Sequence, residues 1–509
     1  MPLAGTAAHE KVGPSRDPKG AVEAICRVCP SLTVGSRVSA IFMGDLWEKA
    51  KFAVLVSILF LTPKLLGSSE IVRLPVNPPV LKNALEQESL GLFPAGDFQV
   101  TTGRCNDCAA PKQALWYFQD ELIAVPKRGL PVAGFDRTLP YLQDVAQWAS
   151  RFEDQDRLPF PPLVWITAPQ ILEHTHLSPD GSSVLAPNRE PIHLTLTPRI
   201  PTNRSYYDRS TVTFFQNRSL RIRGSSHHEG NSITFVARTI WPEDYLIKSE
   251  QLVLLPLQPG ESLSRLIMDE NGGAQGAFIA RLLWKRPAAE SLHGAGKAVL
   301  GFLLSGAQGD DDESLGGHFA VVTGKLGPEG EWANWMVNNF YNLDYESEKG
   351  LIASMVPMDN YLMDLNSGQS YYRPAYLLFA VLKRDRMACR FQGAVERVYN
   401  HFYRHDFYYH ESEANCTGIS MDPLRAIGWE IPRQGPTGFL KAFGAFWYVS
   451  AKDLSFANGE RIYDYLMEER TRLLPRVAFE ACGYDLLQIV EGEARAAKRP
   501  LSPYERMLE

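Results

Sequence analysis

The chain has 509 residues, of which 45% are hydrophobic, and carries a formal net charge of -6 without long runs of a single sign. Such a chain can bury a large core over roughly two to four domains. It lacks the basic footprint that phosphate backbones require, so we expect no nucleic-acid partner. Seven cysteines are too few for a disulfide scaffold, although Cys105 and Cys108 are close enough to pair or to share a metal.

The first recognisable element is an apolar run of eleven residues, Phe52–Thr62, that follows two lysines and precedes a proline and small residues. It is shorter than the roughly 20 residues that span a membrane, and its flanks are typical of a secretory signal. We interpret residues 1–69 as an over-extended start, with Met43 as the expected true start, plus a signal peptide at 52–69. The expected location is periplasmic or secreted, or membrane-anchored if the signal is not cleaved. A buried core helix is the second interpretation.

Residues 70–189 are predicted to form an irregular lead-in with one helix, at Leu139–Phe152. Residues 190–290 change to a period of two, which predicts a β-rich accessory domain, a sandwich or barrel. Its expected strands are PIHLTLTPRI, STVTFFQNRSLRIRG, NSITFVARTIW, QLVLLPLQPG and GAFIARLLWKRP. In a turn of this region lie His227, His228 and Glu229, which are more typical of a solvated loop than of a metal site.

Residues 291–450 begin with a predicted strand, Ala298–Gly306, and an acidic loop, GDDDES, that lacks the spacing of a calcium loop. His318 opens the next strand, HFAVVTGKL, and EWANWMVNNFY is the one after. If a four-residue loop joins them, opposite residues have numbers that sum to 657, so Asn339 faces His318. A slip by one would bring Asn338 there instead. In either case an amide oxygen can accept the ring N–H and turn the other nitrogen toward a nucleophile.

A further predicted strand, Tyr371–Lys383, precedes a long amphipathic helix. Asn415 is a favoured N-cap, which places Cys416 in the first turn of the next helix, a helix that ends at Gly428. Helix-start N–H groups and the macrodipole favour an anion, so we expect a depressed thiol pKa. Asp422-Pro423 is equally typical of a fresh helix start, which would leave Cys416 on a short turn before a kink. The buried positions expected of the long helix are Met387, Phe391, Ala394, Val395, Val398 and Phe402.

A rival constellation lies between these helices, where His401 and His405 are four apart and would share a helix face, a spacing that can hold zinc. No Glu follows the first His and no third ligand is evident, so we expect no metal and no cofactor. The aromatic tract YNHFYRHDFYYH is expected to pack on the preceding helix, with Tyr409 lining the approach to Cys416. Residues 451–509 are predicted to form a helical tail across this domain, frayed at its end.

The order of these motifs resembles the circularly permuted papain-like, NlpC-type fold, in which the histidine precedes the cysteine. The segments GGHFAVVTG, NNFYN and EANCTG are most similar to the Lnb N-terminal periplasmic-domain family. This resemblance implies an α+β fold with an antiparallel sheet packed on helices, and a cysteine hydrolase or transferase. His318 and Cys416 match the family's histidine and cysteine, whereas Gly418 and Pro423 depart from the more helical sequence expected after the cysteine.

We therefore predict a secreted or periplasmic cysteine hydrolase or acyltransferase that acts on an amide or ester, with a peptide amide favoured. Cys416 is the nucleophile, His318 the base and Asn339 the residue that orients it. The expected substrate or oxyanion contacts are Asn415, Asn338 and Tyr409. The substrate would be a peptide, peptidoglycan or lipid ester, and association with the cell envelope is compatible with this prediction. The alternative is a non-catalytic envelope binding or scaffold protein, in which the thiol can be buried. The sequence specifies neither the substrate nor the oligomeric state.

Overall fold

The computed structural model describes residues 81–129, 139–152, 158, 160–186, 191–198, 209–229, 232–267, 278–287, 294–306, 317–341, 353–371, 374–406, 408–410, 412–492 and 499–509. The chain divides into two compact units, Met1–Ser68 and Ser69–Glu509, and every described residue belongs to the second. The expected start at Met43, the signal segment at 52–69 and the acidic loop lie outside the described residues. Within the described residues, no helix combines the length and apolarity needed to span a bilayer.

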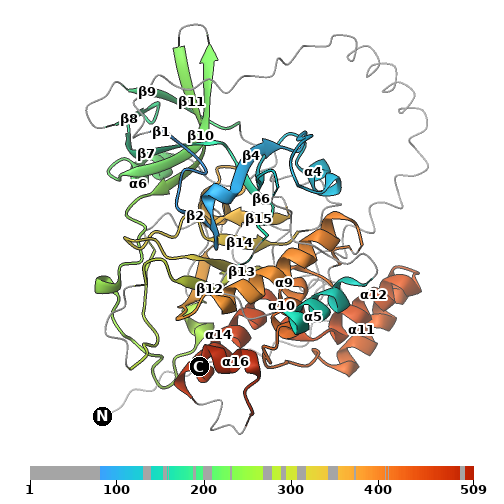
Figure 1. Cartoon of the computed structure of the whole chain (residues 1–509). Helices are drawn as coiled ribbons and strands as arrows, with labels where there is room; N and C mark the ends of the chain where they lie inside the picture. The colour runs from blue at the N-terminus through green and yellow to red at the C-terminus, as the bar shows by residue number, and fades with distance from the viewer. Residues whose placement is uncertain are drawn as a thin grey trace, which may run out of the picture. The chain divides into compact units, whose positions relative to one another are not determined.

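The larger sheet has eight strands, and its neighbours are antiparallel except where β15 and β6 meet in parallel (Figure 1). Every residue of its second strand is buried, as expected for a sheet covered on both faces. In spatial order the strands are β16 (Ala375–Val381), β12 (Ala298–Ser305), β13 (His318–Lys325), β14 (Met336–Asn339), β15 (Ser354–Pro357), β6 (Val164–Thr167), β5 (Leu122–Pro126) and β4 (Phe98–Thr102).

Three helices pack against the centre of this sheet: α9 (Arg386–Tyr403), α10 (Cys416–Ala426) and α14 (Pro475–Glu491). The predicted stripe of α9 is confirmed, because all six of its expected apolar positions are buried. The predicted lead-in helix is also present, as α5 (Tyr141–Arg151), and it packs on α9. Helices on an antiparallel sheet confirm the mixed α+β class.

The second sheet is barrel-like, because β8 pairs with β9 on one side and also with β7. It therefore includes strands of the predicted β-rich region, although three of its six strands come from the segment before residue 190. Its members in spatial order are β1 (Leu81–Asn83), β7 (Gln170–Leu177), β10 (Leu220–Glu229), β11 (Ser232–Pro242), β9 (Ile192–Leu196) and β8 (Ser183–Leu185). A separate small ribbon pairs β2 (Ser89–Leu90) with β3 (Phe93–Pro94).

The expectation of an irregular lead-in is wrong, because β4, β5 and β6 complete the larger sheet. These strands are only four or five residues long. The sequences of β5 and β6, LIAVP and VWIT, are almost entirely buried. A short strand buried on both faces shows no alternation and cannot be told from a loop by its periodicity.

Three strand predictions in the accessory region are also corrected. Arg209–Phe215 is helix α6, and the strand begins only at Leu220. The segments QLVLLPLQPG and GAFIARLLWKRP are joined by a single bridge, Leu254↔Leu282, since their prolines remove ladder donors. The three residues from His227 to Glu229 end β10 rather than forming a turn.

A buried ion cluster joins the barrel-like sheet to the larger one. Asp359, in helix α8 (Met358–Met363), accepts hydrogen bonds from Arg221 at 2.6 Å and from Arg223 at 2.9 Å, both on β10. All three side chains are buried. A buried charge is stable only with such partners, so this cluster constrains how the two sheets meet.

The C-terminal region is helical as predicted, but its end is not frayed over residues 499–509. Helix α16 (Pro503–Leu508) starts with a capping box between Ser502 and Glu505, and Tyr504 is buried. Arg499 bonds to Glu505 at 2.8 Å. The preceding helices are α11 (Phe439–Lys452), α12 (Phe456–Met467) and α13 (Arg470–Leu473); the remaining short ones are α4 (Lys112–Tyr117) and α7 (Leu263–Leu266).

Candidate functional site

His318 is the first residue of β13, and its imidazole ring is contacted both at its edge and on its face. Its Nε2 lies 2.7 Å from Oδ1 of Asn339, and the ring of Tyr341 stacks on the imidazole with centroids 4.6 Å apart. Gly317, just before it, has a φ of +74°, a backbone conformation that residues other than glycine rarely adopt. Because an amide oxygen only accepts, Nε2 carries the proton and Nδ1 the lone pair.

The hairpin register differs from the predicted one by two residues. Val321 pairs with Asn338 and Thr323 with Met336, so paired numbers sum to 659 rather than 657. Asn339 is therefore diagonal to His318 instead of directly opposite. The predicted turn does close, with the Gly327 N–H bonded to the Glu331 carbonyl at 3.0 Å.

The residues just after this turn, 332–335, lie outside the ladder between β13 and β14. The indole N–H of Trp332 donates to the Tyr245 carbonyl at 2.8 Å, and that of Trp335 to the Lys325 carbonyl at 2.9 Å. Both indoles are therefore hydrogen-bonded in the stretch that precedes Met336, the first residue of β14. Since the shift is even, Asn339 stays on the same face as His318.

Asn338 does not take the place of Asn339, so the predicted slip by one is wrong. Its Nδ2 donates to the Val321 carbonyl at 3.0 Å, and its buried Oδ1 has no hydrogen-bond partner. As the neighbour of Asn339 along the strand, it points to the opposite face. The side chain of Asn338 therefore bonds within the sheet and does not contact His318.

Cys416 occupies the first turn of α10, as predicted, with Asn415 as the N-cap. The Asn415 Oδ1 accepts from the N–H groups of Thr417 at 3.0 Å and Gly418 at 2.9 Å. Its Nδ2 donates to the Leu473 carbonyl at 3.0 Å. The oxygen and the nitrogen of this amide thus both stabilise the start of α10. This role is structural and differs from the predicted oxyanion contact.

Helix α10 runs from Cys416 to Ala426 with Pro423 inside it, so the alternative of a fresh start at Asp422-Pro423 does not occur. Gly428, just past the end, has a φ of +101°, as expected of the predicted helix stop. Cys416 therefore sits at the start of one continuous helix.

The thiol of Cys416 faces the beginning of β13. The backbone N–H of Phe319, the residue after His318, is directed at the sulfur, and so is the hydroxyl of Tyr409. The Thr417 hydroxyl lies 3.8 Å from the sulfur. Two segments nearly a hundred positions apart thus meet at one corner of the sheet, with Tyr409 beside the thiol.

Burial raises the pKa of the Cys416 thiol, which corrects the expectation of a depressed value. The side chain is only 5% exposed. The N–H groups of Phe319 and Thr417 and the hydroxyls of Thr417 and Tyr409 act in the opposite direction, but desolvation outweighs them. The resting sulfur is therefore a thiol, and it needs a base before it can act as a nucleophile.

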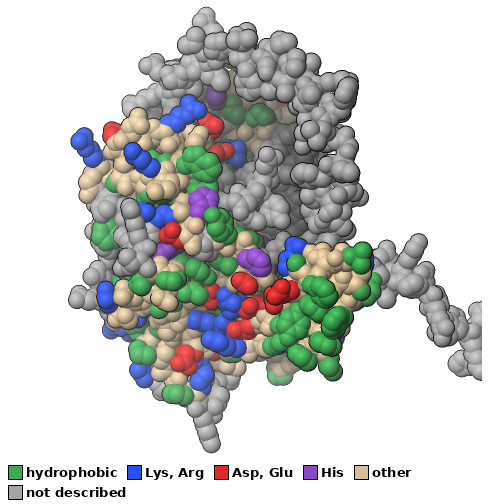
Figure 2. All heavy atoms as spheres, turned by 90° about the vertical axis from the view of Figure 1, so that its right-hand side faces the viewer, with side chains coloured by type: hydrophobic (Ala, Val, Ile, Leu, Met, Phe, Trp, Pro, Cys, Tyr) green, Lys and Arg blue, Asp and Glu red, His purple; other side chains and the backbone are tan. Residues whose placement is uncertain are grey.

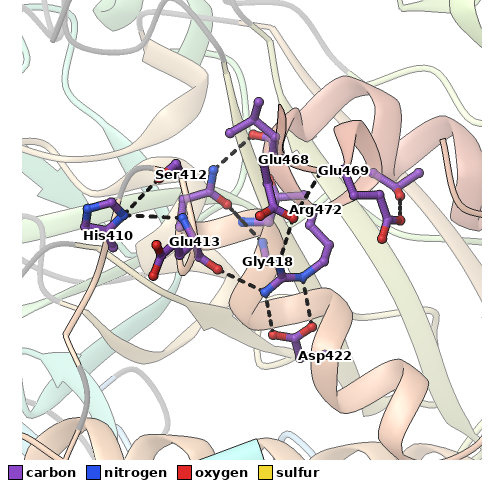
Figure 3. A network of polar contacts seen from close by, with 12 residues as sticks. His410, Ser412, Glu413, Gly418, Asp422, Glu468, Glu469 and Arg472 are labelled. Atoms are coloured by element: carbon purple, nitrogen blue, oxygen red, sulfur yellow. Dashed lines mark hydrogen bonds and ion pairs between the residues drawn. The ribbon is translucent and has the colours of Figure 1, made fainter. Parts of the chain in front are cut away.

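The loop before Cys416 is tied to two helices by Arg472 (Figure 3). The guanidinium donates to the Glu413 carbonyl at 2.9 Å, to Asp422 of α10 at 3.0 Å and to Glu468 at 2.8 Å. Within the loop, the Nδ1 of His410 accepts from the Ser412 hydroxyl at 3.0 Å. This network fixes the approach of the chain to the cysteine.

The rival histidines do not share a helix face, because α9 ends at Tyr403 and His405 has a φ of +58°. His401 is buried between two carboxylates, with Nε2 at 3.0 Å from Asp144 and Nδ1 at 3.1 Å from Asp406. Within the described ranges, no group of three or more His, Cys, Asp or Glu side chains could hold a metal ion. Cys105 and Cys108 are both free thiols.

Two contacts of the site escaped the sequence analysis. Tyr341 covers the imidazole, and its position two residues after Asn339 in the strand alternation was the signal that could have shown it. The N–H of Phe319 has no sequence signal, since every residue but proline carries one.

Comparison with known proteins yields no assignment, because no family model, curated protein or solved structure matches the chain.

Proposed function

We propose that the chain is a cysteine hydrolase or acyltransferase with Cys416 as its nucleophile and His318 as its base. The observation that carries this proposal is the 2.7 Å bond between Nε2 of His318 and Asn339, next to a backbone N–H that faces the sulfur. That bond leaves Nδ1 as the basic nitrogen of the imidazole, and the stacked ring of Tyr341 helps to hold its orientation. A merely structural histidine does not require this arrangement beside a thiol.

In the proposed reaction, Nδ1 of His318 takes the thiol proton and the Cys416 sulfur attacks the carbonyl carbon of an amide or ester. The N–H groups of Phe319 and Cys416 are suited to bond the oxygen that becomes negative. His318 returns the proton to the leaving nitrogen or oxygen as its bond to the carbonyl carbon breaks. Water or another acceptor then attacks the thioester, and the thiol is regenerated.

The order of the residues supports a member of the permuted papain-like, NlpC-type superfamily, similar to the Lnb N-terminal periplasmic-domain family. A peptide amide is the favoured bond, in a peptide or in peptidoglycan, with a lipid ester as the other substrate class. Residues 52–69 support a periplasmic or secreted location for this activity. These features extend the proposal beyond the chemistry of the two residues.

The second candidate is a non-catalytic envelope protein in which the same domain is a scaffold. The observation that favours it is burial: Cys416 is 5% exposed and His318 is 3% exposed. A scaffold can keep its thiol sealed, whereas an enzyme must admit its substrate to the sulfur.

Labelling with a thiol-directed electrophile at neutral pH distinguishes the two. Cys389 and Cys482 are also buried cysteines outside any disulfide, so they are matched internal controls. The enzyme requires Cys416 to react faster than both, its label to disappear in Cys416→Ala, and the rate to fall in His318→Gln. Mass mapping of the modified residue reads out all three. Equal reaction of the three cysteines, unchanged by His318→Gln, would support the scaffold instead.

A further inference from the structure

The outer side of α11 is apolar and exposed over its whole length. Leu440 is 83% exposed and Trp447 52%, and the loop that follows adds Leu454 at 92%. Figure 2 shows hydrophobic side chains gathered over this hairpin of α11 and α12. We call the set the α11 patch; its members are Phe439, Leu440, Phe443, Trp447, Tyr448, Leu454 and Phe456.

The rings of the patch form a continuous row. Phe439 stacks on Phe443 with centroids 6.1 Å apart, Phe443 contacts Trp447 at 6.3 Å, and Trp447 contacts Phe456 at 6.4 Å. Each ring is thus held by its neighbours while its outer surface faces solvent. Monomeric proteins rarely expose a contiguous apolar surface of this kind without a binding role.

The opposite side of α11 anchors the helix to α12. Ala442 and Val449 are buried there, Ser450 is buried near the C-terminal end of the helix, and Gly459 of α12 permits the close approach. A Cβ at Gly459 would lie 1.9 Å from the Ser450 Oγ. The inner side of α11 is therefore packed against α12. The exposed apolar side chains belong to a helix whose position is well defined.

The charges of α11 are all positive. Lys441 and Lys452 are exposed, and no acidic residue occurs between Phe439 and Lys452. At 100° per residue both lysines fall on one edge of the apolar arc. The exposed acids of α12, Glu460 and Asp464, lie on the other helix of the pair. An aromatic arc edged by lysines is the pattern of a helix that lies in a membrane interface.

We propose that the α11 patch docks on an anionic lipid surface, with the helix axis in the plane of the interface. Its 14 residues are too few to span a bilayer. Aromatic side chains prefer the headgroup region, and lysines at the edge pair with anionic lipids. A second copy docked with the same edge of its arc against this one would set Lys441 and Lys452 against like charges, which disfavours that mode of self-association. The inference is independent of the proposed catalysis.

The test measures co-sedimentation of the full chain with vesicles of phosphatidylglycerol and phosphatidylcholine, and of phosphatidylcholine alone. All chains carry Leu55→Asp and Leu59→Asp, so that the apolar run at Phe52–Thr62 does not bind lipid by itself. The patch variant is Phe443→Ser with Trp447→Ser. Its matched control is Trp116→Ser, an equally exposed tryptophan on α4, outside the patch.

We expect the patch variant to lose about tenfold or more of its vesicle affinity, and the control to lose none. Reversing Lys441 and Lys452 to Glu should weaken binding to anionic vesicles by at least about fivefold for each lysine, because attraction is replaced by repulsion. The two substitutions should have little effect on neutral vesicles. Should the patch variant fold poorly, Leu440→Ser with Leu454→Ser replaces it, because these are the most exposed members.

Two results would overturn the proposal. One is equal vesicle binding by the patch variant and the parent chain. The other is no vesicle binding by the parent together with a concentration-dependent dimer, seen by light scattering, that the patch variant abolishes. That second result would assign the patch to a second copy of the chain.

Discussion

Two buried polar clusters of this protein differ in whether their side chains are ionised. Around Asp359 the groups are fully ionic, since one carboxylate is shared between Arg221 and Arg223. Around Cys416 and His318 the side chains are held by an amide, hydroxyls and backbone N–H groups, and burial keeps the sulfur protonated. The first cluster holds two guanidinium groups on one carboxylate, so its hydrogen bonds support buried charges and its role is to stabilise the fold. The second cluster holds the thiol proton of Cys416, which the proposed reaction transfers to His318.

The largest effect should follow from breaking the ionic cluster. Asp359→Ala leaves two buried guanidinium groups without their carboxylate, so we expect a loss of about 3–5 kcal/mol in the free energy of unfolding. Denaturant titration measures it. Asp120→Ala, which removes an exposed partner of Arg104, is the matched control, with an expected loss of no more than about 1 kcal/mol. Similar losses in both variants would remove the distinction between the two kinds of cluster.

The next effect concerns the neutral cluster and is kinetic. Asn339→Ala removes the acceptor that orients His318, so we expect labelling of Cys416 to slow by about tenfold or more. Asn339→Asp keeps an oxygen acceptor and should retain more of the rate. The pH profile of alkylation is the readout, because a purely structural asparagine would change stability without moving that profile. An unchanged profile in Asn339→Ala would remove Asn339 from the site.

A third polar group shows the cost of burying an acid without a charged partner. Burial raises the pKa of Glu396 well above its ordinary value near 4.5, and its Oε1 has no hydrogen-bond partner. Above pH 4.5 the unfolded chain releases this proton while the folded chain retains it. The free energy of unfolding therefore falls by about 1.4 kcal/mol per pH unit until the folded pKa is reached.

Glu396→Gln removes this pH dependence. We expect it to leave stability unchanged near pH 4 and to increase it progressively as the pH rises toward neutrality. Thermal melting over a pH series measures the effect. Glu460→Gln, at an exposed position of α12, is the control and should show no such trend. A gain that does not depend on pH would contradict the assignment of a retained proton.

The smallest effect concerns the helix start that carries the cysteine. Asn415→Ala removes the cap from two N–H groups and should cost about 1 kcal/mol of stability. Asn415→Ser keeps a capping oxygen and should recover most of it. Comparing the melting temperatures of the two variants separates capping from catalysis. A loss of labelling in Asn415→Ser without a loss of stability would restore the oxyanion role that was expected of this residue.

The features that depend on neighbours along the chain could be predicted from the amino-acid sequence. The stripe of α9, the Asn415 cap ahead of Cys416 and the stop at Gly428 follow from helix periodicity and capping, which act over a few residues. The hairpin turn after β13 and the amide beside His318 were also predictable. That amide was found despite a wrong register, because an even shift preserves the face.

Features that depend on distant segments became visible only in the folded chain. The indole of Trp332 bonds to the Tyr245 carbonyl, in a distant segment, and β14 begins only at Met336, with a register two residues from the predicted one. The short buried strands β5 and β6 carry no alternation, so their place in the larger sheet depends on partners far away in the chain. The pKa of Cys416 was predicted in the wrong direction because a helix start is local, whereas desolvation is produced by everything packed around the sulfur.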